Sequence, residues 1–392
     1  MYKHPRLTSV KIKGYRPFRD FVATLSPLEV IVGSNGSGKS CLFEFLKFLR
    51  DGMQGDIPSE IIPGSIGQQI FHIPGPEKFA WDLEIDLADR VPVRYQGELT
   101  GPRTRHEVST ERVESATEGV RPFLFLDRRG DRGFIHQPAG EVHAEIQQEM
   151  VSRRDRLALG TIADPRMKIL LQLGDYIRSW RFYSTFNIAT DKIRKPVLVG
   201  PEPWLDEDGG NLSAVLHYLM TEHPELFDQL QLHLRGQIRG FQSLTVKARS
   251  APGEVMTFWR EQGCDRELSL ADLSDGSLRL ICWFSLCLHP NPPSLICIDE
   301  PEQGLHPRTF PVLAAFFDKA SWKHTQILVT SHGSFFLLQF DFEQIALLRK
   351  ENGAAKFLKP ALSQIITDMI KDFGIEEIEL MHRSDELEVL PL

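Results

Sequence analysis

The glycine-rich stretch at residues 33–40, Gly-Ser-Asn-Gly-Ser-Gly-Lys-Ser, constrains the fold of this chain more than any other feature. It fits the pattern G-x-x-x-x-G-K-[ST]. The apolar run at residues 28–32 predicts a buried strand before it, and residues 41–49 predict a helix after it. Glycines allow successive backbone N–H groups to converge at the positive end of a helix dipole. The sequence therefore predicts a strand, loop and helix that together hold phosphate groups.

The side chains of this loop have separate predicted roles. Lys39 places a positive charge at the β- and γ-phosphates of a nucleotide, and the Ser40 hydroxyl is positioned to hold Mg²⁺. The predicted nucleotide-binding residues are Gly33, Ser34, Asn35, Gly36, Ser37, Gly38, Lys39, Ser40 and Cys41. A plain glycine-rich turn is the alternative, and the flanking strand and helix argue against it.

A second set of segments lies far along the chain. Residues 273–277, Leu-Ser-Asp-Gly-Ser, open a predicted apolar helix that stops before a proline-rich turn. A predicted buried strand at residues 294–298 ends in Asp299 and Glu300. Another, at residues 326–330, ends in Ser331 and His332.

The order of these motifs resembles that of the ATP-binding-cassette ATPases, and within them the soluble branch of SMC, RecF and OLD-type proteins. The resemblance covers both ends of the chain and leaves its middle largely unmatched. It implies an α/β fold: a P-loop NTPase with an ABC-type ATPase head and an inserted, mainly helical lobe. The cofactors that it implies are ATP and Mg²⁺.

The acidic pair has a physical role at such a nucleotide. Asp299 can orient Mg²⁺ through water, and Glu300 can act as the general base that polarises the attacking water. A strand that ends in a solvated acidic turn is the alternative. His332 matches the family's switch histidine, which contacts the γ-phosphate, although a lone histidine is more often packed or on the surface.

Ser274, Asp275 and Gly276 match the family's signature, which faces the ATP of a second subunit, so the resemblance implies a homodimer in the ATP state. A Ser-x-Gly turn at a helix N-terminus can form a second anion-binding site. The alternative is that these residues only cap the helix. Asp275 replaces the commoner glycine, and this carboxylate near triphosphate is expected to weaken or tune closure. Residues 303–306 resemble the loop that crosses the dimer interface.

Other family positions are less well defined. Arg16 lies in a segment that resembles one of SMC heads, where it approaches the nucleotide or forms a structural turn. The glutamine that senses Mg²⁺ has several candidates, among them Gln68, Gln69 and Gln96. OLD proteins carry a nuclease domain after the ATPase, and about 60 residues follow His332, too few for that domain. We therefore expect any nuclease or other effector to be a separate protein.

Motif spacing predicts the domain organisation. Residues 1–90 and 262–350 form a split ATPase lobe, residues 91–261 an inserted helical or lid lobe, and residues 351–392 a C-terminal extension. Within the insertion, residues 101–119 are expected to form a loop or exposed hairpin, and residues 141–180 and 212–234 to be helical. The insertion lacks the sustained heptads of an SMC coiled coil.

Composition favours a cytoplasmic protein with a large core and no membrane span or signal peptide. Five cysteines show no metal-binding spacing, so buried thiols are expected. The net charge of -8 does not favour nucleic acid, but basic residues cluster locally. The cluster contains Arg178, Arg181, Lys192, Arg194, Lys195, Arg235, Arg239, Lys247 and Arg249. Its aromatic neighbours are Trp180, Phe182, Tyr183 and Phe186, which either stack DNA or RNA bases or pack in a core.

These patterns predict a Mg²⁺-dependent ATPase that dimerises around ATP and couples closure to DNA maintenance or to an antiviral defence effector. The alternative is a nucleotide-gated scaffold or regulatory binding module with very slow turnover. A transporter's cassette subunit is disfavoured, because the large insertion between the phosphate loop and the signature fits SMC- and RecF-like heads better.

Overall fold

The computed structural model divides into two compact units. Unit 1 comprises Met1–Trp180 and Phe342–Leu392, and unit 2 comprises Arg181–Asp341. The predicted lobe boundaries near residues 90, 262 and 350 stay a prediction. The structure describes residues 4–57, 70–88, 90–101, 106–117, 119, 121–139, 145–184, 186, 191–248 and 253–362.

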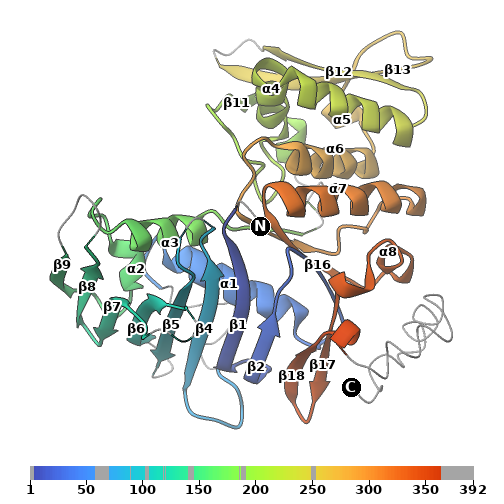
Figure 1. The fold of residues 1–392 in the computed structure, drawn as a ribbon. Coiled ribbons are helices and arrows are strands. Elements are labelled where there is room, and N and C mark those ends of the chain that lie inside the picture. The colour runs from blue at the N-terminus through green and yellow to red at the C-terminus, as the bar shows by residue number, and fades with distance from the viewer. Residues whose placement is uncertain are drawn as a thin grey trace. The chain divides into compact units, whose positions relative to one another are not determined.

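Unit 1 contains an eight-stranded antiparallel sheet in the order β2-β1-β4-β5-β6-β7-β8-β9 (Figure 1). Every second residue of β4 and β5 is buried, as expected when one face of a sheet is covered. The strands are β1 (Arg6–Tyr15), β2 (Phe18–Thr24), β4 (Lys78–Asp86), β5 (Val93–Thr100), β6 (Glu107–Ser115), β7 (Leu124–Arg129), β8 (Arg132–Gln137) and β9 (Ile146–Val151).

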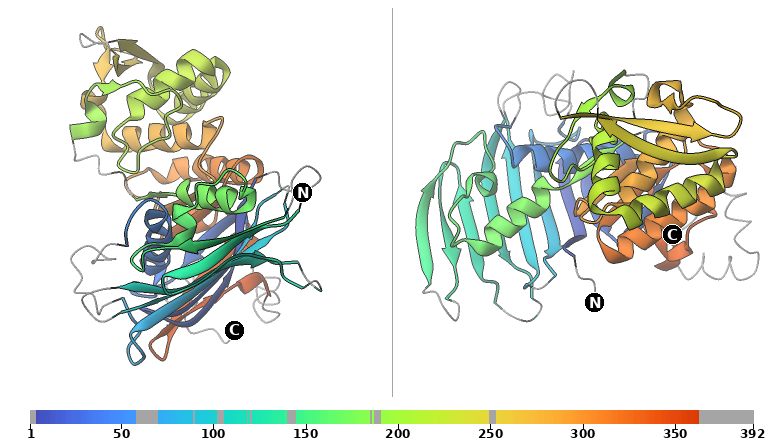
Figure 2. Two further views of the ribbon diagram at one scale, coloured as in Figure 1. Left: turned by 90° about the vertical axis from the view of Figure 1, so that its left-hand side faces the viewer. Right: turned by 90° about the horizontal axis from the view of Figure 1, so that it is seen from above.

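Helices cover one face of this sheet, and Figure 2 shows α3 lying across its strands. The Phe48 ring of α1 meets the rings of Phe79 and Trp81 of β4 edge-on, at centroid distances of 5.6 and 6.2 Å. The helices of unit 1 are α1 (Lys39–Gly52), α2 (Ala158–Thr161) and α3 (Lys168–Arg178). The predicted helix after the phosphate loop is therefore confirmed, and it is anchored by aromatic packing.

Unit 1 also holds the strand that precedes the phosphate loop. β3 (Leu28–Val32) is buried along its whole length and pairs in parallel with β17 (Ile345–Glu351), which pairs antiparallel with β18 (Ala354–Leu358). Two short 3₁₀ turns, η4 (Phe342–Gln344) and η5 (Pro360–Leu362), flank these two C-terminal strands. A strand buried on both faces reads as a continuous apolar run, which is why the sequence identified it.

The predicted helical character of the insertion is wrong for its first half. Residues 93–151 form β5 to β9, and β9 occupies part of the segment predicted as helix at residues 141–180. The polar stretch near residue 107 is β6, which pairs with both β5 and β7. Pairing with neighbouring strands decides this structure, because β9 has too few apolar residues to show a period of two.

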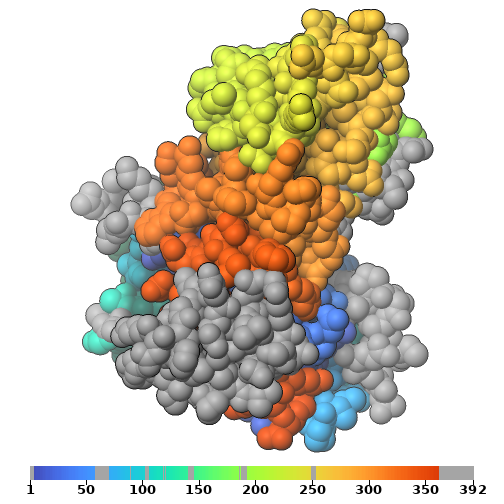
Figure 3. Space-filling model, turned by 90° about the vertical axis from the view of Figure 1, so that its right-hand side faces the viewer, coloured from blue at the N-terminus to red at the C-terminus, as the bar shows by residue number. Residues whose placement is uncertain are grey.

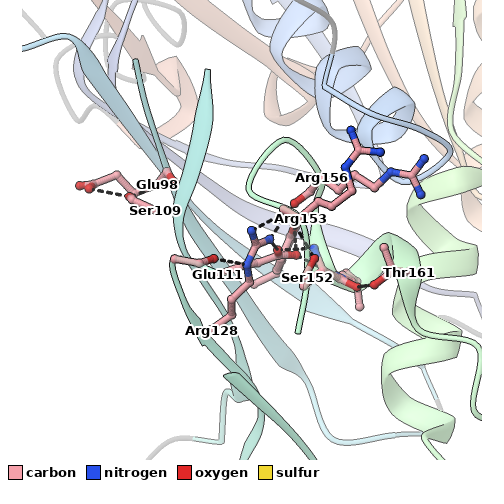
Figure 4. Close-up of polar contacts among 12 residues, drawn as sticks. Glu98, Ser109, Glu111, Arg128, Ser152, Arg153, Arg156 and Thr161 are labelled. Carbon is pink, nitrogen blue, oxygen red and sulfur yellow. Dashed lines mark hydrogen bonds and ion pairs between the residues drawn. The ribbon is translucent and has the colours of Figure 1, made fainter. Parts of the chain in front are cut away.

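A fully buried ion pair joins β6 and β7 to the segment before α2 (Figure 4). Arg128 Nη1 lies 3.4 Å from Glu111 Oε2, and neither side chain is exposed. The same guanidinium donates to the backbone oxygens of Arg153 and Arg156 at 2.8 and 2.7 Å. Glu111 also accepts the backbone N–H of Leu159 at 3.0 Å. Buried charges require such partners, so this network fixes the sheet to α2.

Unit 2 contains strands of two sheets and, among its described residues, five helices. Figure 3 shows residues 205–260 and the orange segment of α7 and α8 at opposite ends of the unit. Strands β10 (Arg181–Tyr183), β15 (Leu295–Asp299) and β16 (Gln326–Ser331) are parallel. The second sheet contains β11 (Val197–Leu198), β12 (Phe241–Ala248), β13 (Glu254–Glu261) and β14 (Leu268–Ser269). The helices are α4 (Leu212–Glu222), α5 (Pro224–Gln237), α6 (Asp275–Leu288), α7 (Phe310–Lys323) and α8 (Ser334–Leu337), with 3₁₀ turns η1 (Asp191–Arg194), η2 (Leu270–Asp272) and η3 (Pro307–Thr309).

Several predicted elements of unit 2 are confirmed: the helices on either side of Pro224, the apolar helix after residue 274, and the two buried strands that end in polar residues. Cys282 and Cys297 are buried in α6 and β15, as expected for core thiols. In the part of the chain that the structure describes, no helix has the length and apolar character needed to cross a bilayer.

Candidate nucleotide-binding site

The phosphate loop connects β3 to α1 in unit 1, and glycines determine its path. A Cβ at Gly33 would lie 2.0 Å from the backbone oxygen of Leu348, so no side chain fits there. Gly36 and Gly38 have φ of 82° and 115°, a region that other residues rarely adopt. The loop turns directly into the N-terminus of α1, where backbone N–H groups lack helical partners.

Lys39 begins α1 and folds back over the loop. Its Nζ donates to the backbone oxygens of Gly33 at 2.6 Å and Ser34 at 3.0 Å, and the side chain is buried. The amine therefore lies inside the loop, and its predicted role at the β- and γ-phosphates stays a prediction. Ser40 is exposed and Cys41 is half-buried at the same helix end, and burial raises the pKa of the Cys41 thiol.

Arg16 forms an ion pair with Glu44 of α1, one turn after the phosphate loop. Its own φ is 46°, so it occupies a tight turn between β1 and β2. The structural turn, one of the two alternatives predicted for Arg16, is thus present. Whether it reaches a nucleotide stays a prediction.

The acidic loop of unit 2, residues 299–303, follows β15. Asp299 ends this buried strand, and the Thr330 hydroxyl of neighbouring β16 donates to its Oδ1. Because β15 and β16 are parallel and in register, Asp299 and Thr330 lie side by side at the carboxyl edge of the sheet. Ligand-binding residues of α/β proteins concentrate at such edges.

Glu300 has a strained backbone and a fixed carboxylate. Its φ is 51°, which is uncommon for a residue with a Cβ and is typical of functional sites. Its backbone N–H donates to Thr330 O at 3.0 Å. The Gln303 amide donates to Glu300 Oε2, and His332 Nε2 lies 3.3 Å from Oε1. The structure thus brings together Glu300 and His332, two residues that the sequence analysis assigned separately.

Glu302 belongs to this arrangement, although the sequence analysis gave it no role. Its Oε1 accepts the Ser331 hydroxyl at 2.5 Å and the Gly333 N–H at 3.2 Å, so it spans the residues on both sides of His332. Burial raises the pKa of this carboxyl. The sequence pointed to a role for Glu302 only in that it is a third carboxylate close to Asp299 and Glu300.

The signature residues occupy the start of α6. Ser274 is its N-cap, and its Oγ accepts the Ser277 N–H at 3.3 Å, so the predicted capping geometry is present. Ser274 and Asp275 are exposed. The anion-binding role of these residues stays a prediction, and it is compatible with capping because both use the same helix terminus.

Close packing joins the signature to the loop that follows the acidic pair. A Cβ added at Gly276 would lie 3.0 Å from the backbone oxygen of Gly304. Gly304 itself has φ of 72°, and a Cβ there would overlap the Arg279 guanidinium at 1.8 Å. The start of α6 therefore packs closely against Gly304 of the loop at residues 303–306.

Three of the four aromatic residues of the basic cluster are buried, and Phe182 is half-buried. Trp180, Tyr183 and Phe186 are at most 1% exposed, so the core-packing alternative is correct for these three. The cluster's cations also have protein partners: Lys192 pairs with Asp208 at 2.9 Å, and Arg181 lies 4.7 Å from the ring of Trp204. Arg249 lies outside the described residues.

The Mg²⁺-sensing glutamine is not identified. Gln68 and Gln69 lie outside the described residues. Gln96 is in β5 and donates to Asp82 Oδ2 at 3.2 Å. Its role stays a prediction.

Known structures share this fold. The SmcHead solved bound to the C-winged helix domain of ScpA matches with a TM-score of 0.56 and 13% identity, over 90% of this chain and 97% of that one. The Smc head domain of Pyrococcus furiosus, solved with an extended coiled coil and bound to the C-terminal domain of ScpA, matches with a TM-score of 0.53 and 11% identity, over 94% and 100%. At such identities the likeness shows the fold.

The fold and the phosphate loop define the class as P-loop NTPases with an SMC-like head. Within this class, the family described as "AAA domain, putative AbiEii toxin, Type IV TA system" matches residues 29–337. The match spans most of the chain, so the protein belongs to this family. The predicted resemblance to SMC-type ATPases is therefore confirmed.

Proposed function

We propose that this protein is a Mg²⁺-dependent ATPase that forms a homodimer around ATP and transmits closure to a separate effector protein. The observation that carries the proposal is the preorganised pair of Glu300 and His332, with His332 Nε2 3.3 Å from Glu300 Oε1. It is supported by a phosphate loop with a buried lysine in the same chain. General bases must be positioned before they can be effective.

The phosphate loop suits a triphosphate. Gly33 admits no side chain, and Gly36 and Gly38 hold the backbone in conformations that aim N–H groups inward. The buried Ser37 hydroxyl has no hydrogen-bond partner in the described structure, which marks a polar position awaiting a ligand. Lys39 supplies the balancing charge.

The hydrolytic step assigns distinct tasks to the side chains. Glu300 accepts a proton from the attacking water, and His332 holds the carboxylate and faces the γ-phosphate. Ser40 and Asp299 would hold Mg²⁺, which neutralises the charge of the β- and γ-phosphates when bound. The Thr330 hydroxyl keeps Asp299 oriented for that task.

In the proposed dimer, the signature of one subunit binds the ATP held by the other subunit. Ser274 and Asp275 are exposed at a helix N-terminus, and the backbone N–H groups there suit the γ-phosphate bound to a partner's phosphate loop. Gly276 keeps this surface fixed against residues 303–306. The contact between the signature and the partner's ATP would therefore make dimerisation depend on bound ATP in both subunits.

The effector is better supported as a protein than as DNA or RNA. Three of the four aromatic side chains proposed to stack bases, Trp180, Tyr183 and Phe186, are in the core. The related SmcHead was solved with a protein, the C-winged helix domain of ScpA. The family description names a putative toxin of a type IV TA system, so among the predicted pathways we favour a defence role over DNA maintenance.

A nucleotide-gated scaffold with very slow turnover is the second candidate. Both oxygens of the Glu300 carboxylate are engaged, one by Gln303 and one by His332. Proton transfer to Glu300 must compete with these two contacts, which would slow hydrolysis while ATP stays bound.

Quenched-flow and steady-state ATPase assays test the proposal. We expect phosphate release that requires Mg²⁺, depends on protein concentration through dimerisation, and is lost on addition of EDTA. Stoichiometric ATP binding with less than one turnover per hour would favour the scaffold instead. Absence of nucleotide binding by calorimetry would contradict both candidates.

A further inference from the structure

Arg194, a residue of the predicted basic cluster, contacts the signature. It ends the 3₁₀ turn η1, and more than 70 residues separate it in sequence from the segment that it contacts. Its Nη1 lies 3.1 Å from the backbone oxygen of Leu270, 2.9 Å from that of Ala271 and 3.2 Å from that of Leu273. Three carbonyl oxygens thus converge on one nitrogen, directly before the signature begins.

The second terminal nitrogen of Arg194 reaches the signature itself. Nη2 donates to Asp275 Oδ1 at 2.9 Å, and the arginine side chain is 21% exposed. Asp275 is 60% exposed and stands at the start of α6, where the helix dipole already favours negative charge. The planar guanidinium allows both sets of contacts at once, because its donors point in different directions.

The two sets of contacts have different physical effects. Converging carbonyl dipoles repel one another unless a cation lies between them, so Nη1 fixes the turn that leads into Ser274. Asp275 replaces the glycine that is commoner in the signature of the ATP-binding-cassette proteins that this chain resembles. Its carboxylate would repel a triphosphate that approaches Ser274. Nη2 opposes that charge. Lys192, on the same turn, instead pairs with Asp208.

We propose that Arg194 is a positioning residue of the signature: it fixes the turn at residues 270–273 and neutralises Asp275, so that a partner's ATP can approach Ser274. This inference rests on the proposed ATP-bound dimer. It moves Arg194 from the predicted nucleic-acid surface to the closure machinery. It also explains how the chain tolerates an acidic residue at a position that faces phosphate.

The test compares ATP-dependent dimerisation in a Glu300→Gln background, where hydrolysis is blocked. Arg194→Ala is expected to raise the ATP concentration for half-maximal dimerisation about tenfold, the effect of one uncompensated charge near phosphate. ATP binding to the monomer should be unchanged. Lys192→Ala removes the same charge from the same turn without touching the signature, and it should dimerise like the parent.

Asp275→Asn separates charge from general structure. Added to Arg194→Ala, it should recover most of the lost dimerisation, because no carboxylate is left to neutralise. Salt should also lessen the defect of Arg194→Ala, since screening weakens repulsion between charges. Arg194→Lys, which keeps the charge but reaches fewer carbonyls, should show an intermediate defect and serves as the test if Arg194→Ala does not fold.

Three outcomes would overturn the inference: dimerisation of Arg194→Ala at the parental ATP concentration, an equal defect in Lys192→Ala, or no recovery with Asp275→Asn. In the case that Arg194→Ala does not fold, parental dimerisation by Arg194→Lys would overturn it as well. Ser274→Arg distinguishes failure of the underlying function. If it dimerises normally with ATP, the signature does not face nucleotide at all, whereas a defect in Ser274→Arg together with a normal Arg194→Ala would reject only the role of Arg194.

Discussion

The imidazole Nε2 of His332 lies 3.3 Å from Oε1 of Glu300, and the two residues follow adjacent parallel strands. Glu300 accomplishes this with a left-handed backbone, φ 51°, which turns its side chain toward the end of β16. Such a conformation costs roughly 1–2 kcal/mol in an L-residue, so it must be compensated by surrounding contacts. The hydrogen bond from the Gln303 amide and the contact with His332 provide that compensation.

Replacement of the proposed base separates binding from chemistry. Glu300→Gln should bind ATP with parental affinity, because the amide is isosteric and remains able to hydrogen-bond. Hydrolysis should fall at least about 100-fold, since an amide cannot accept the proton of the attacking water. Single-turnover kinetics measure this directly. Gln303→Ala is the matched control, because it removes a hydrogen-bond partner of Glu300 but leaves the base in place. Hydrolysis by Glu300→Gln at the parental rate would reject the assignment of Glu300 as the base.

Removal of the loop lysine should abolish tight nucleotide binding. Lys39 Nζ is the buried cation of the phosphate loop, and no other side chain of the loop carries a positive charge. Lys39→Ala is expected to weaken ATP affinity at least about 100-fold by titration calorimetry. Lys47→Ala removes an exposed lysine from the same helix and should bind as the parent does. Equal affinities of all three proteins would contradict the loop assignment.

The buried ion pair of unit 1 should dominate the stability of that sheet. Glu111→Ala leaves the Arg128 guanidinium buried without its carboxylate and should lower the free energy of unfolding by about 3–5 kcal/mol. Glu107→Ala, on the same strand, breaks an exposed pair with Arg154 and should cost at most about 1 kcal/mol. Denaturant titration distinguishes the two. Similar losses in both variants would show that burial does not set the difference.

Acid should destabilise unit 2 through His289. Burial lowers the pKa of this imidazole to about 4, and its Nδ1 accepts the Asn291 N–H at 3.2 Å. Because the unfolded state, with a pKa near 6.5, binds the proton more readily, stability is lost as the pH falls from about 6.5 toward 4. Between pH 7 and 4.5 the parent should lose about 2.5 kcal/mol more than His289→Asn, whose side-chain oxygen keeps an acceptor. Parallel pH profiles would contradict this.

The sequence alone predicted the elements whose structure is decided by residues close together along the chain. β3, β15 and β16 are continuous apolar runs that end in residues with clear chemistry, and the glycines and lysine of the phosphate loop have few other uses. The N-cap at Ser274 also follows from a short pattern. In each of these cases the residues that decide the structure lie within about ten positions of one another.

Features that depend on distant contacts were not predictable in this way. β9 is a strand because β8 pairs with it, although its own residues are mostly exposed and polar. Arg194 reads as part of a basic cluster, and its contacts with residues 270–275 exist only after folding. Glu302 holds both neighbours of His332 from a position about 30 residues earlier. The sequence also left open whether Trp180 and Tyr183 stack bases or pack in a core, because their burial depends on the whole fold.

The central claim is that each ATP is bound by the phosphate loop of one subunit and the signature of the other. Ser274→Arg and Lys39→Ala should each be inactive alone, the first through bulk at the partner's γ-phosphate and the second through lost ATP binding. A mixture forms heterodimers with one intact composite site, in which Ser274→Arg supplies the phosphate loop. The account predicts partial recovery of ATPase activity in the mixture, up to about one quarter of the parental rate if subunits exchange freely and the sites act independently. No recovery, with heterodimers verified by mass spectrometry, would contradict it.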